Sequence, residues 1–226
     1  MATHTYHIDS APPGNSQQDT RKARGKKAKS RPPPAIKQSI PTGTSILQWN
    51  VNSVFERKAE LMEILASTQP HVVCLQESKL KPTDKLYIPG YNIVRKDRTH
   101  KGGGGVLTAI KTGMPYTSID IDCKDALCIQ IKMENNYVYI TNLYVPPKSD
   151  YPTEEIRKHL ITHHSMKHIL LGDMNAYSPI SGADRTNKYG KEIERIVNEV
   201  NLDALNRGVV THLTAKGDKI PILTSH

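Results

Sequence analysis

Four short polar motifs, each following an apolar run, hold the residues best suited to chemistry. They are Trp49-Asn50, Gln76-Glu77-Ser78, Asn142-Leu143-Tyr144-Val145-Pro146 and Gly172-Asp173-Met174-Asn175. Their carboxylates, amides and phenol can bind cations, accept protons and donate hydrogen bonds. Loops at strand ends often carry such groups on a rigid frame. Each motif alone is more simply explained as a solvated strand end, an ordinary turn or a helix cap.

The residues between the motifs predict an α/β fold. Apolar runs predict strands over residues 45–50, 72–75, 104–110, 126–131, 137–143 and 167–171. Apolar spacing and helix-start signals predict helices over residues 56–68, 152–164 and 190–202. The first strand, the first helix and the second strand follow the order of a parallel crossover unit. Glu134-Asn135-Asn136 predicts a hairpin turn.

The order of the four motifs resembles that of the endonuclease/exonuclease/phosphatase family, over about residues 45–226. That family includes abasic-site DNA endonucleases, inositol-polyphosphate phosphatases and retrotransposon endonucleases. The resemblance implies a four-layer α/β sandwich of two packed mixed sheets flanked by helices, with the site at one edge. It also implies hydrolysis of phosphodiesters with Mg²⁺ or Mn²⁺. A phosphodiester already carries charge on its oxygens, so its hydrolysis needs a cation and a positioned water.

The resemblance assigns a role to each polar residue. Glu77 would be the main metal carboxylate, with Asn50 helping to arrange the metal site, which suits the oxygen ligands of Mg²⁺. Asp173 would orient and deprotonate the attacking water, and Asn175 would donate hydrogen bonds to the phosphate or hold that water. Tyr144 would donate a hydrogen bond to the phosphate or hold the site in shape. Without the neighbouring motifs, an aromatic residue at a strand edge would explain Tyr144 equally well.

Residues after Asn175 resemble the endonuclease branch of non-LTR (LINE-type) retrotransposons. The matching segments there are Thr186-Asn187-Lys188-Tyr189-Gly190, Leu205-Asn206-Arg207-Gly208 and Thr211. Earlier in the chain, Gly102 to Gly105 resembles the glycine-rich start of a central strand in the same branch. Thr211 matches a threonine near the family's site and is expected to contact the substrate. This branch nicks target DNA and leaves a 3′-hydroxyl that primes reverse transcription. The glycine run is also explained as a flexible turn before a strand.

The resemblance stops short of two terminal family motifs, an Ile-Asp strand and a Ser-Asp-His. The sequence ends at Leu223-Thr224-Ser225-His226, so we expect a domain that lacks its last strands, has an open sheet edge and is impaired in catalysis. No histidine is assigned to catalysis, and His159 and His163 are interpreted as a solvated helix face rather than a metal pair. A non-catalytic nucleic-acid-binding remnant is therefore one alternative. A phosphatase of a small or lipid phosphate is another.

The charge of the chain is concentrated near its beginning. Residues 1–43 hold eight Lys or Arg and two Asp, a net +6 of the total +9, so residues 44–226 carry only +3. We expect residues 1–43 to be a disordered basic and Pro-rich tail, and residues 44–226 to be the enzyme domain. The tail is a candidate nucleic-acid arm or nuclear import signal, and a solvated linker explains it as well. The arm residues are Arg21, Lys22, Arg24, Lys26, Lys27, Lys29 and Arg31.

Composition also indicates the cellular compartment and the partners to expect. Its cysteines, Cys74, Cys123 and Cys128, form no Cys-x-x-Cys pair, so we expect buried thiols rather than disulfides or a zinc site. No apolar run has the length of a membrane span. The expected protein is intracellular, and nuclear if the basic run is an import signal. We expect the protein to bind DNA, and we expect neither membrane association nor an obligate protein partner.

Overall fold

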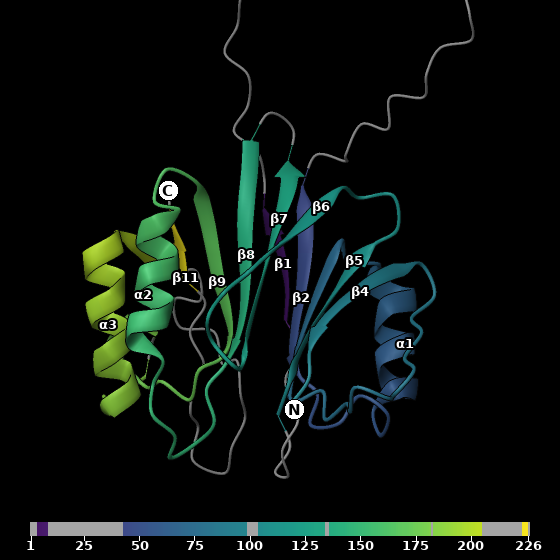
Figure 1. The fold of residues 1–226 in the computed structure, drawn as a ribbon, viewed down its shortest axis with the longest axis horizontal. Coiled ribbons are helices and arrows are strands. Elements are labelled where there is room, and N and C mark those ends of the chain that lie inside the picture. Colours follow the sequence, from purple (N-terminus) through teal and green to yellow (C-terminus); the bar gives the residue numbers. More distant parts are fainter. Residues whose placement is uncertain are drawn as a thin grey trace, which may run out of the picture.

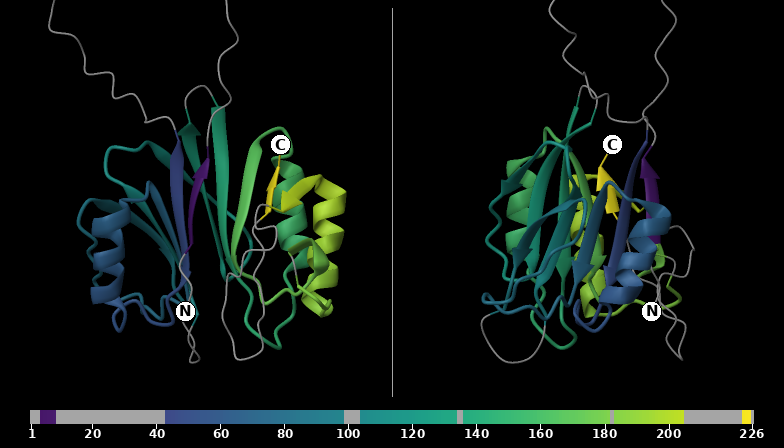
Figure 2. Two further views of the ribbon diagram at one scale, coloured as in Figure 1. Left: turned by 180° about the vertical axis from the view of Figure 1, so that it is seen from behind. Right: turned by 90° about the vertical axis from the view of Figure 1, so that its right-hand side faces the viewer.

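Two facing β-sheets form the centre of the protein, and helices cover the outer face of each sheet (Figure 1). The computed structural model describes residues 4–8, 43–98, 104–133, 136–181, 183–204 and 223–225. Helix α1 lies outside the first sheet, and helices α2 and α3 lie outside the second (Figure 2). The expected four-layer α/β sandwich of two mixed sheets is confirmed.

The first sheet has the strand order β1-β2-β3-β5-β4. Strands β2 and β3 run parallel and are joined by α1, and the other neighbouring strands run antiparallel. This is the crossover unit that the sequence predicts. The elements are β1 (His4–Ile8), β2 (Thr44–Asn50), α1 (Lys58–Thr68), β3 (Val72–Gln76), β4 (Tyr91–Lys96) and β5 (Val106–Lys111).

The second sheet has the strand order β10-β11-β9-β8-β7-β6. It repeats the plan of the first, because β8 and β9 run parallel and α2 joins them. Strands β7 and β8 form a long hairpin, as the sequence predicts, but Asn136, which was expected in the turn, pairs with Met133. The elements are β6 (Tyr116–Ile119), β7 (Ala126–Met133), β8 (Asn136–Tyr144), α2 (Thr153–Thr162), β9 (Lys167–Asp173), the 3₁₀ turn η1 (Pro179–Ser181), α3 (Lys188–Val200), β10 (Leu202–Ala204) and β11 (Leu223–Ser225).

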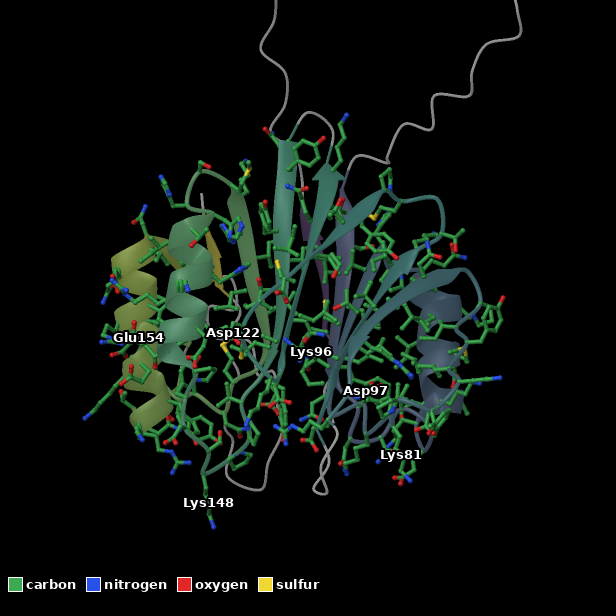
Figure 3. All side chains as sticks on the ribbon, viewed as in Figure 1. Lys81, Lys96, Asp97, Asp122, Lys148 and Glu154 are labelled. Carbon is green, nitrogen blue, oxygen red and sulfur yellow. The ribbon has the colours of Figure 1, made fainter. Side chains whose placement is uncertain are left out.

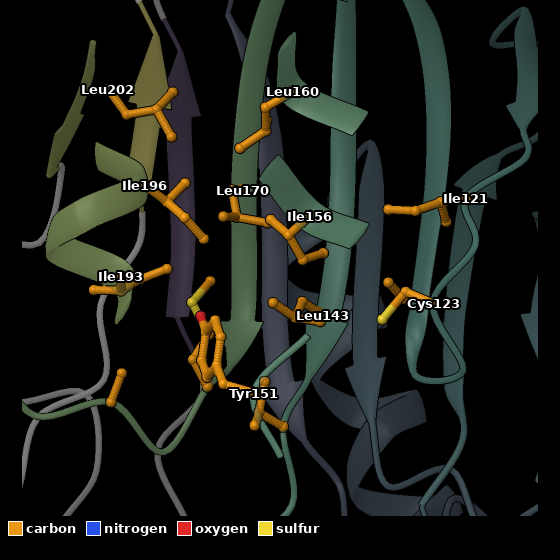
Figure 4. Packing of buried hydrophobic residues seen from close by; sticks show 14 of the residues in the cluster. Ile121, Cys123, Leu143, Tyr151, Ile156, Leu160, Leu170, Ile193, Ile196 and Leu202 are labelled. Carbon is orange, nitrogen blue, oxygen red and sulfur yellow. The ribbon is translucent and has the colours of Figure 1, made fainter. Parts of the chain in front are cut away.

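Apolar residues fill all three spaces between the four layers. Because side chains alternate across a strand, Ile46 of β2 packs between the sheets while Leu47 packs under α1 with Leu61. Under α2 and α3, the sheet residue Leu170 belongs to the same buried cluster as Ile156 of α2 and Ile193 of α3 (Figure 4). Each fully buried side chain of this size stabilises the fold by about 1.5–3 kcal/mol. None of the helices in the described ranges is long and apolar enough to cross a membrane.

The structure differs from the sequence predictions mainly at the sheet edges. Strand β1 lies within the segment expected to be disordered, and it pairs with β2, so that expectation is wrong for His4–Ile8. The basic arm lies outside the described residues. Strands β4 and β6 were not predicted, because neither shows a clear apolar alternation. Strand β11 pairs with β9, where we expected an open sheet edge.

Candidate active site

The two parallel strand pairs bring the polar motifs to one edge of the sandwich. In the first sheet Asn50 is the register partner of Gln76, directly before Glu77. In the second sheet Tyr144 is the partner of Asp173. The carboxyl ends of parallel strands meet at the same sheet edge. The ends of β8 and β9 lie at the bottom of Figure 1.

One amide joins the carboxylates of both sheets. The Asn50 Nδ2 donates to Glu77 Oε1 at 2.8 Å and to Asp173 Oδ2 at 2.7 Å. The contact between Asn50 and Asp173 spans 123 residues of sequence. The structure therefore brings together three residues that the sequence named separately. Their chemical roles stay predictions.

The donor set of this point suits a hard divalent cation. Two carboxylates turn toward the NH₂ group of one amide, so a positive charge placed between the carboxylates would be favourable. Turning the Asn50 amide over would present its Oδ1 to the same point. Mg²⁺ commonly binds one or two carboxylates and keeps several waters, so Glu77, Asp173 and Asn50 fit it. Within the described residues no cluster of three His, Cys, Asp or Glu side chains could hold a metal by itself.

Two site residues have a backbone conformation that side chains seldom adopt. Glu77 has φ +52° and Asn175 has φ +48°. Such residues cost about 1–3 kcal/mol each, and they persist only where the surroundings fix them. The Glu77 carbonyl accepts from Ser53 N at 2.8 Å, and the Asn175 side chain donates to Val145 O at 2.9 Å. The site loops are therefore held in place by contacts with neighbouring segments.

Gly172, in the Gly-Asp-Met-Asn motif, is required by the close approach of β8. Its φ is +141°, and a Cβ added there would lie 1.8 Å from Leu143 O. A side chain at this position would push β9 away from β8. The glycine therefore allows Asp173 and Tyr144 to stay in register at the strand ends.

Asn187 links helix α3 to the site. As the N-cap of α3 its Oδ1 accepts from Gly190 N at 2.7 Å, and it also accepts from Tyr177 N at 3.1 Å. Its Nδ2 donates to Asn175 O at 2.7 Å. Gly190 is needed here, because an added Cβ would lie 1.9 Å from Tyr177 O. From the sequence alone, this Asn-x-x-Gly segment supported only the resemblance to a family branch, and it predicted no contact with the site.

The Tyr144 phenol is protonated at neutral pH. Burial raises its pKa, as do the charge of Glu77, a hydrogen bond to the Glu77 carboxylate and the charge of Asp173, whereas Arg98 lowers it. The phenol therefore donates to Glu77 in this structure. It has a proton available for a hydrogen bond to any anionic group that enters the site.

A buried amide network crosses between the sheets directly beneath the site. Gln48 Nε2 donates to Gln76 Oε1 at 2.6 Å, and Gln76 Nε2 donates to Asn142 Oδ1 at 2.7 Å. The Asn142 amide donates in turn to Leu107 O at 3.0 Å. Gln76 and Asn142 are both fully buried. These two motif residues therefore align the sheets, and they do not face a substrate.

An ion pair beside the site was missed by the sequence analysis. Arg98, two residues after β4, binds Asp125 through two nitrogens, with Nε 2.6 Å from Oδ1. The guanidinium carbon also lies 5.7 Å from the centre of the Tyr144 ring. Nothing in the sequence pointed to these residues, because they belong to no motif and the preceding strand was not predicted.

Three histidines lie at the opposite end of the second sheet. His159, His163 and His168 surround the Tyr139 ring, with ring centroids 6.5, 5.0 and 5.2 Å from it. His159 is only 6% exposed, so the prediction that it belongs to a solvated helix face is wrong. Burial and the neighbouring imidazoles lower the pKa of His159 to about 4. Thr211, the expected substrate contact, lies outside the described residues.

The fold and the site together define a class of protein. An α/β sandwich whose paired strand ends converge in two carboxylates and their amide partners is suited to hydrolysing phosphate esters. A sequence model of the Endonuclease/Exonuclease/phosphatase family matches residues 47–219. The chain belongs to that family.

Individual relatives agree with this membership. The chain is 32% identical over 109 residues to a DNA-(apurinic or apyrimidinic site) endonuclease of Dictyostelium discoideum, a match that covers 45% of this chain and 30% of the relative. Among solved structures it is similar to the endonuclease domain of TRAS1, a telomere-specific non-LTR retrotransposon, with a TM-score of 0.70 and 18% identity over 80% of this chain and 83% of the other. It is also similar to an AP endonuclease of Leishmania major, with a TM-score of 0.66 and 13% identity over 80% of this chain and 78% of the other. At these identities the structures show a shared fold.

Proposed function

We propose that the protein is a divalent-metal-dependent endonuclease that hydrolyses phosphodiester bonds in DNA, of the non-LTR retrotransposon type. The observation that supports this best is the meeting of Glu77 and Asp173, from different sheets, at the Asn50 amide. The likeness to the retrotransposon endonuclease fold supports it further.

The residues present divide the work of hydrolysis between them. Glu77 and Asn50 would hold Mg²⁺ or Mn²⁺, which when bound offsets the negative charge of the phosphate oxygens. Asp173 accepts a proton from the attacking water, whose oxygen then bonds to phosphorus. The bond from phosphorus to the 3′ oxygen breaks, and that oxygen takes a proton from solvent. The products are a 5′-phosphate and a 3′-hydroxyl.

Two neighbours prepare the groups that act. Asp173 Oδ1 accepts from Asn175 N at 3.3 Å while Oδ2 accepts from Asn50, which keeps the carboxylate in one orientation. Tyr144 keeps its proton because its pKa is raised by burial and by Glu77, so it can donate a hydrogen bond to a phosphate oxygen. Asn175 keeps the loop after β9 in place beside it.

The charge of the chain supports a nucleic-acid substrate. A net charge of +9, two thirds of it before residue 44, favours a polyanion. We propose that Arg21 to Arg31 form a DNA-binding arm and place the protein in the nucleus. Salt-sensitive DNA affinity that falls when residues 21–31 are deleted is the expected result, and unchanged affinity would refute the role of the arm.

A plasmid-nicking assay with Mg²⁺ tests the activity. Asp173→Ala and Glu77→Ala should each lower the rate by at least two orders of magnitude, about the loss expected for a general base or a metal ligand. Glu63→Ala is the matched control, because this acid is exposed on α1, outside the first sheet. Equal residual nicking in the wild type and in both site variants, with DNA binding intact, would instead establish a non-catalytic binder.

The choice of substrate separates the remaining possibilities. An intact duplex and a duplex with one abasic site are cleaved side by side, and the nicked product is offered to a DNA polymerase. The expected result is that the intact duplex is nicked and that the polymerase extends the nick. Extension requires a 3′-hydroxyl, which is the product of the proposed reaction. Cleavage confined to the abasic site would overturn the retrotransposon assignment and keep the nuclease activity.

A further inference from the structure

We propose that Arg98, held by Asp125, is a positioning residue for Tyr144. This inference rests on the proposed function for its catalytic meaning, but the contacts that carry it belong to the fold itself. The guanidinium holds the Tyr144 ring in one orientation. In that orientation the phenol can donate its hydrogen bond to Glu77 or to a phosphate.

The guanidinium is held in one geometry. Its Nε lies 2.6 Å from Asp125 Oδ1, and its Nη2 contacts Oδ2, so the pair is bidentate. The side chains are 29% and 10% exposed, so the pair is shielded enough to be stronger than a surface ion pair. A two-pronged contact of this kind removes most of the rotational freedom of an arginine.

The same pair contacts Tyr144 twice. The Asp125 carbonyl accepts from Tyr144 N at 2.8 Å, which fixes the backbone of the tyrosine. The Arg98 guanidinium carbon lies 5.7 Å from the centre of the ring, within the range of a cation–π contact. Asp125, Arg98 and Tyr144 therefore form a closed triangle in which each residue touches the other two.

The glycine-rich segment makes room for this arrangement. A Cβ added at Gly104 would lie 2.5 Å from Arg98 Nε, and the φ of Gly104 is +98°. A glycine is thus needed where β5 approaches, because any side chain would displace the guanidinium. The contact therefore gives Gly104 a physical reason that neither a flexible turn nor a family resemblance supplies.

Lys96 offers a natural comparison for a purely structural tie between the sheets. Its Nζ donates to Ile121 O at 2.9 Å and to Cys123 O at 2.8 Å, on the loop that leads to Asp125. Figure 3 shows Lys96 between the two sheets. If Arg98 only held the sheets together, removing either cation should have the same effect on Tyr144.

The first test needs no enzymatic activity. The full chain is prepared with 3-fluorotyrosine at position 144 only, and its ¹⁹F resonance is recorded at neutral pH. Arg98→Met should shift the resonance, because the ring loses the cation that lies over its face. Lys96→Met should leave the resonance unchanged. An unshifted resonance in Arg98→Met would overturn the proposal.

A companion variant guards against misfolding. Arg98→Met leaves the largely buried Asp125 carboxylate without its partner, which destabilises the fold. Arg98→Met with Asp125→Asn removes the pair together, and it should show the same fluorine shift. The wild-type resonance in this folded double variant would also refute the proposal.

Kinetics then distinguish positioning from direct contact with the phosphate. Arg98→Met and Tyr144→Phe should each lower kcat for nicking by roughly 10- to 100-fold, with little change in KM. The combination of Arg98→Met with Tyr144→Phe should be no slower than Tyr144→Phe alone, since Arg98 acts through Tyr144. Losses that multiply would show that Arg98 contacts the substrate itself, which overturns the positioning role. If the wild type does not nick DNA, the proposed function fails while the fluorine result still decides the inference.

Discussion

Asn187 allows the stability of a helix to be separated from the geometry of the site. Its Oδ1 caps α3 by accepting from Gly190 N and also accepts from Tyr177 N, whereas its Nδ2 donates to Asn175 O. Asn187→Ala removes all three hydrogen bonds, and Asn187→Asp keeps both acceptor contacts while it loses the donor. The two variants therefore divide one side chain into its two functions.

The expected magnitudes follow from the contacts. Loss of an N-cap costs about 1 kcal/mol, and each of the other two hydrogen bonds contributes about 1 kcal/mol. Asn187→Ala should therefore lower the free energy of unfolding by about 3 kcal/mol. Asn187→Asp should lower it by only about 1 kcal/mol, because a carboxylate is a good cap at a helix N-terminus.

Catalysis should respond in a different order from stability. The lost donor releases Asn175, whose left-handed backbone at φ +48° depends on its surroundings. Both variants should lower kcat to a similar extent, by roughly 10- to 100-fold, since small displacements at a site have effects of that size. KM should change little, because Asn187 contacts the loop and not the substrate in the proposed mechanism.

Urea unfolding and plasmid nicking, measured on the same preparations, test this reasoning. Asn201→Ala is the matched control: it lies at the other end of α3 with φ +53°, so it should lose about 1 kcal/mol of stability and keep full nicking. Wild-type nicking by Asn187→Asp would refute the link between Asn187 and the site. Wild-type stability of Asn187→Ala would refute the capping argument.

Three further predictions concern the strands, the histidines and the metal. Gly172→Ala should destabilise the fold by about 3 kcal/mol or more in urea unfolding, since its Cβ would overlap Leu143 O at 1.8 Å; a loss under 1 kcal/mol would contradict the close approach. The pKa of His159 is lowered from 6.5 to about 4, so the unfolded chain binds the proton more readily and stability should fall between pH 6.5 and 4, by up to about 3 kcal/mol. In His159→Gln the free energy of unfolding, measured with urea, should depend less on pH over that window. An unchanged slope would contradict the role given to His159. Mg²⁺ at 100 times its Kd should stabilise the wild type by about 2.7 kcal/mol, seen as a rise in Tm that EDTA reverses; the same rise in Glu77→Ala would place the ion elsewhere.

Much of the fold could be predicted because its central strands are buried on both faces. Strands β3 and β9 read as short continuous apolar runs, a pattern that few other elements share. Strands β4 and β6 escaped prediction because they lie at sheet edges and are half exposed, so apolar spacing carries little information there. Strand β1 depends on pairing with β2 across a long stretch of sequence, which local propensity does not encode.

The site could be predicted only as far as motifs mark strand ends. Asn50, Glu77 and Asp173 stood out because polar residues ended apolar runs, and parallel strands place such ends at one edge. Arg98 and Asp125 were missed because their contact spans 27 residues and depends on how β4 meets the second sheet. The role of Asn187 was missed for a similar reason: its motif was visible, but its contact with Asn175 is tertiary.

The site depends on the relative position of the two sheets. Asn50 and Glu77 come from the first sheet, and Asp173 and Tyr144 come from the second. Apolar packing between the sheets has no strong directional preference, so it would tolerate small sliding movements. The buried amides of Gln76 and Asn142 would lose their hydrogen bonds in any shifted arrangement, which costs about 1–3 kcal/mol for each unpaired group. The amide network thus selects the one alignment in which both carboxylates reach Asn50.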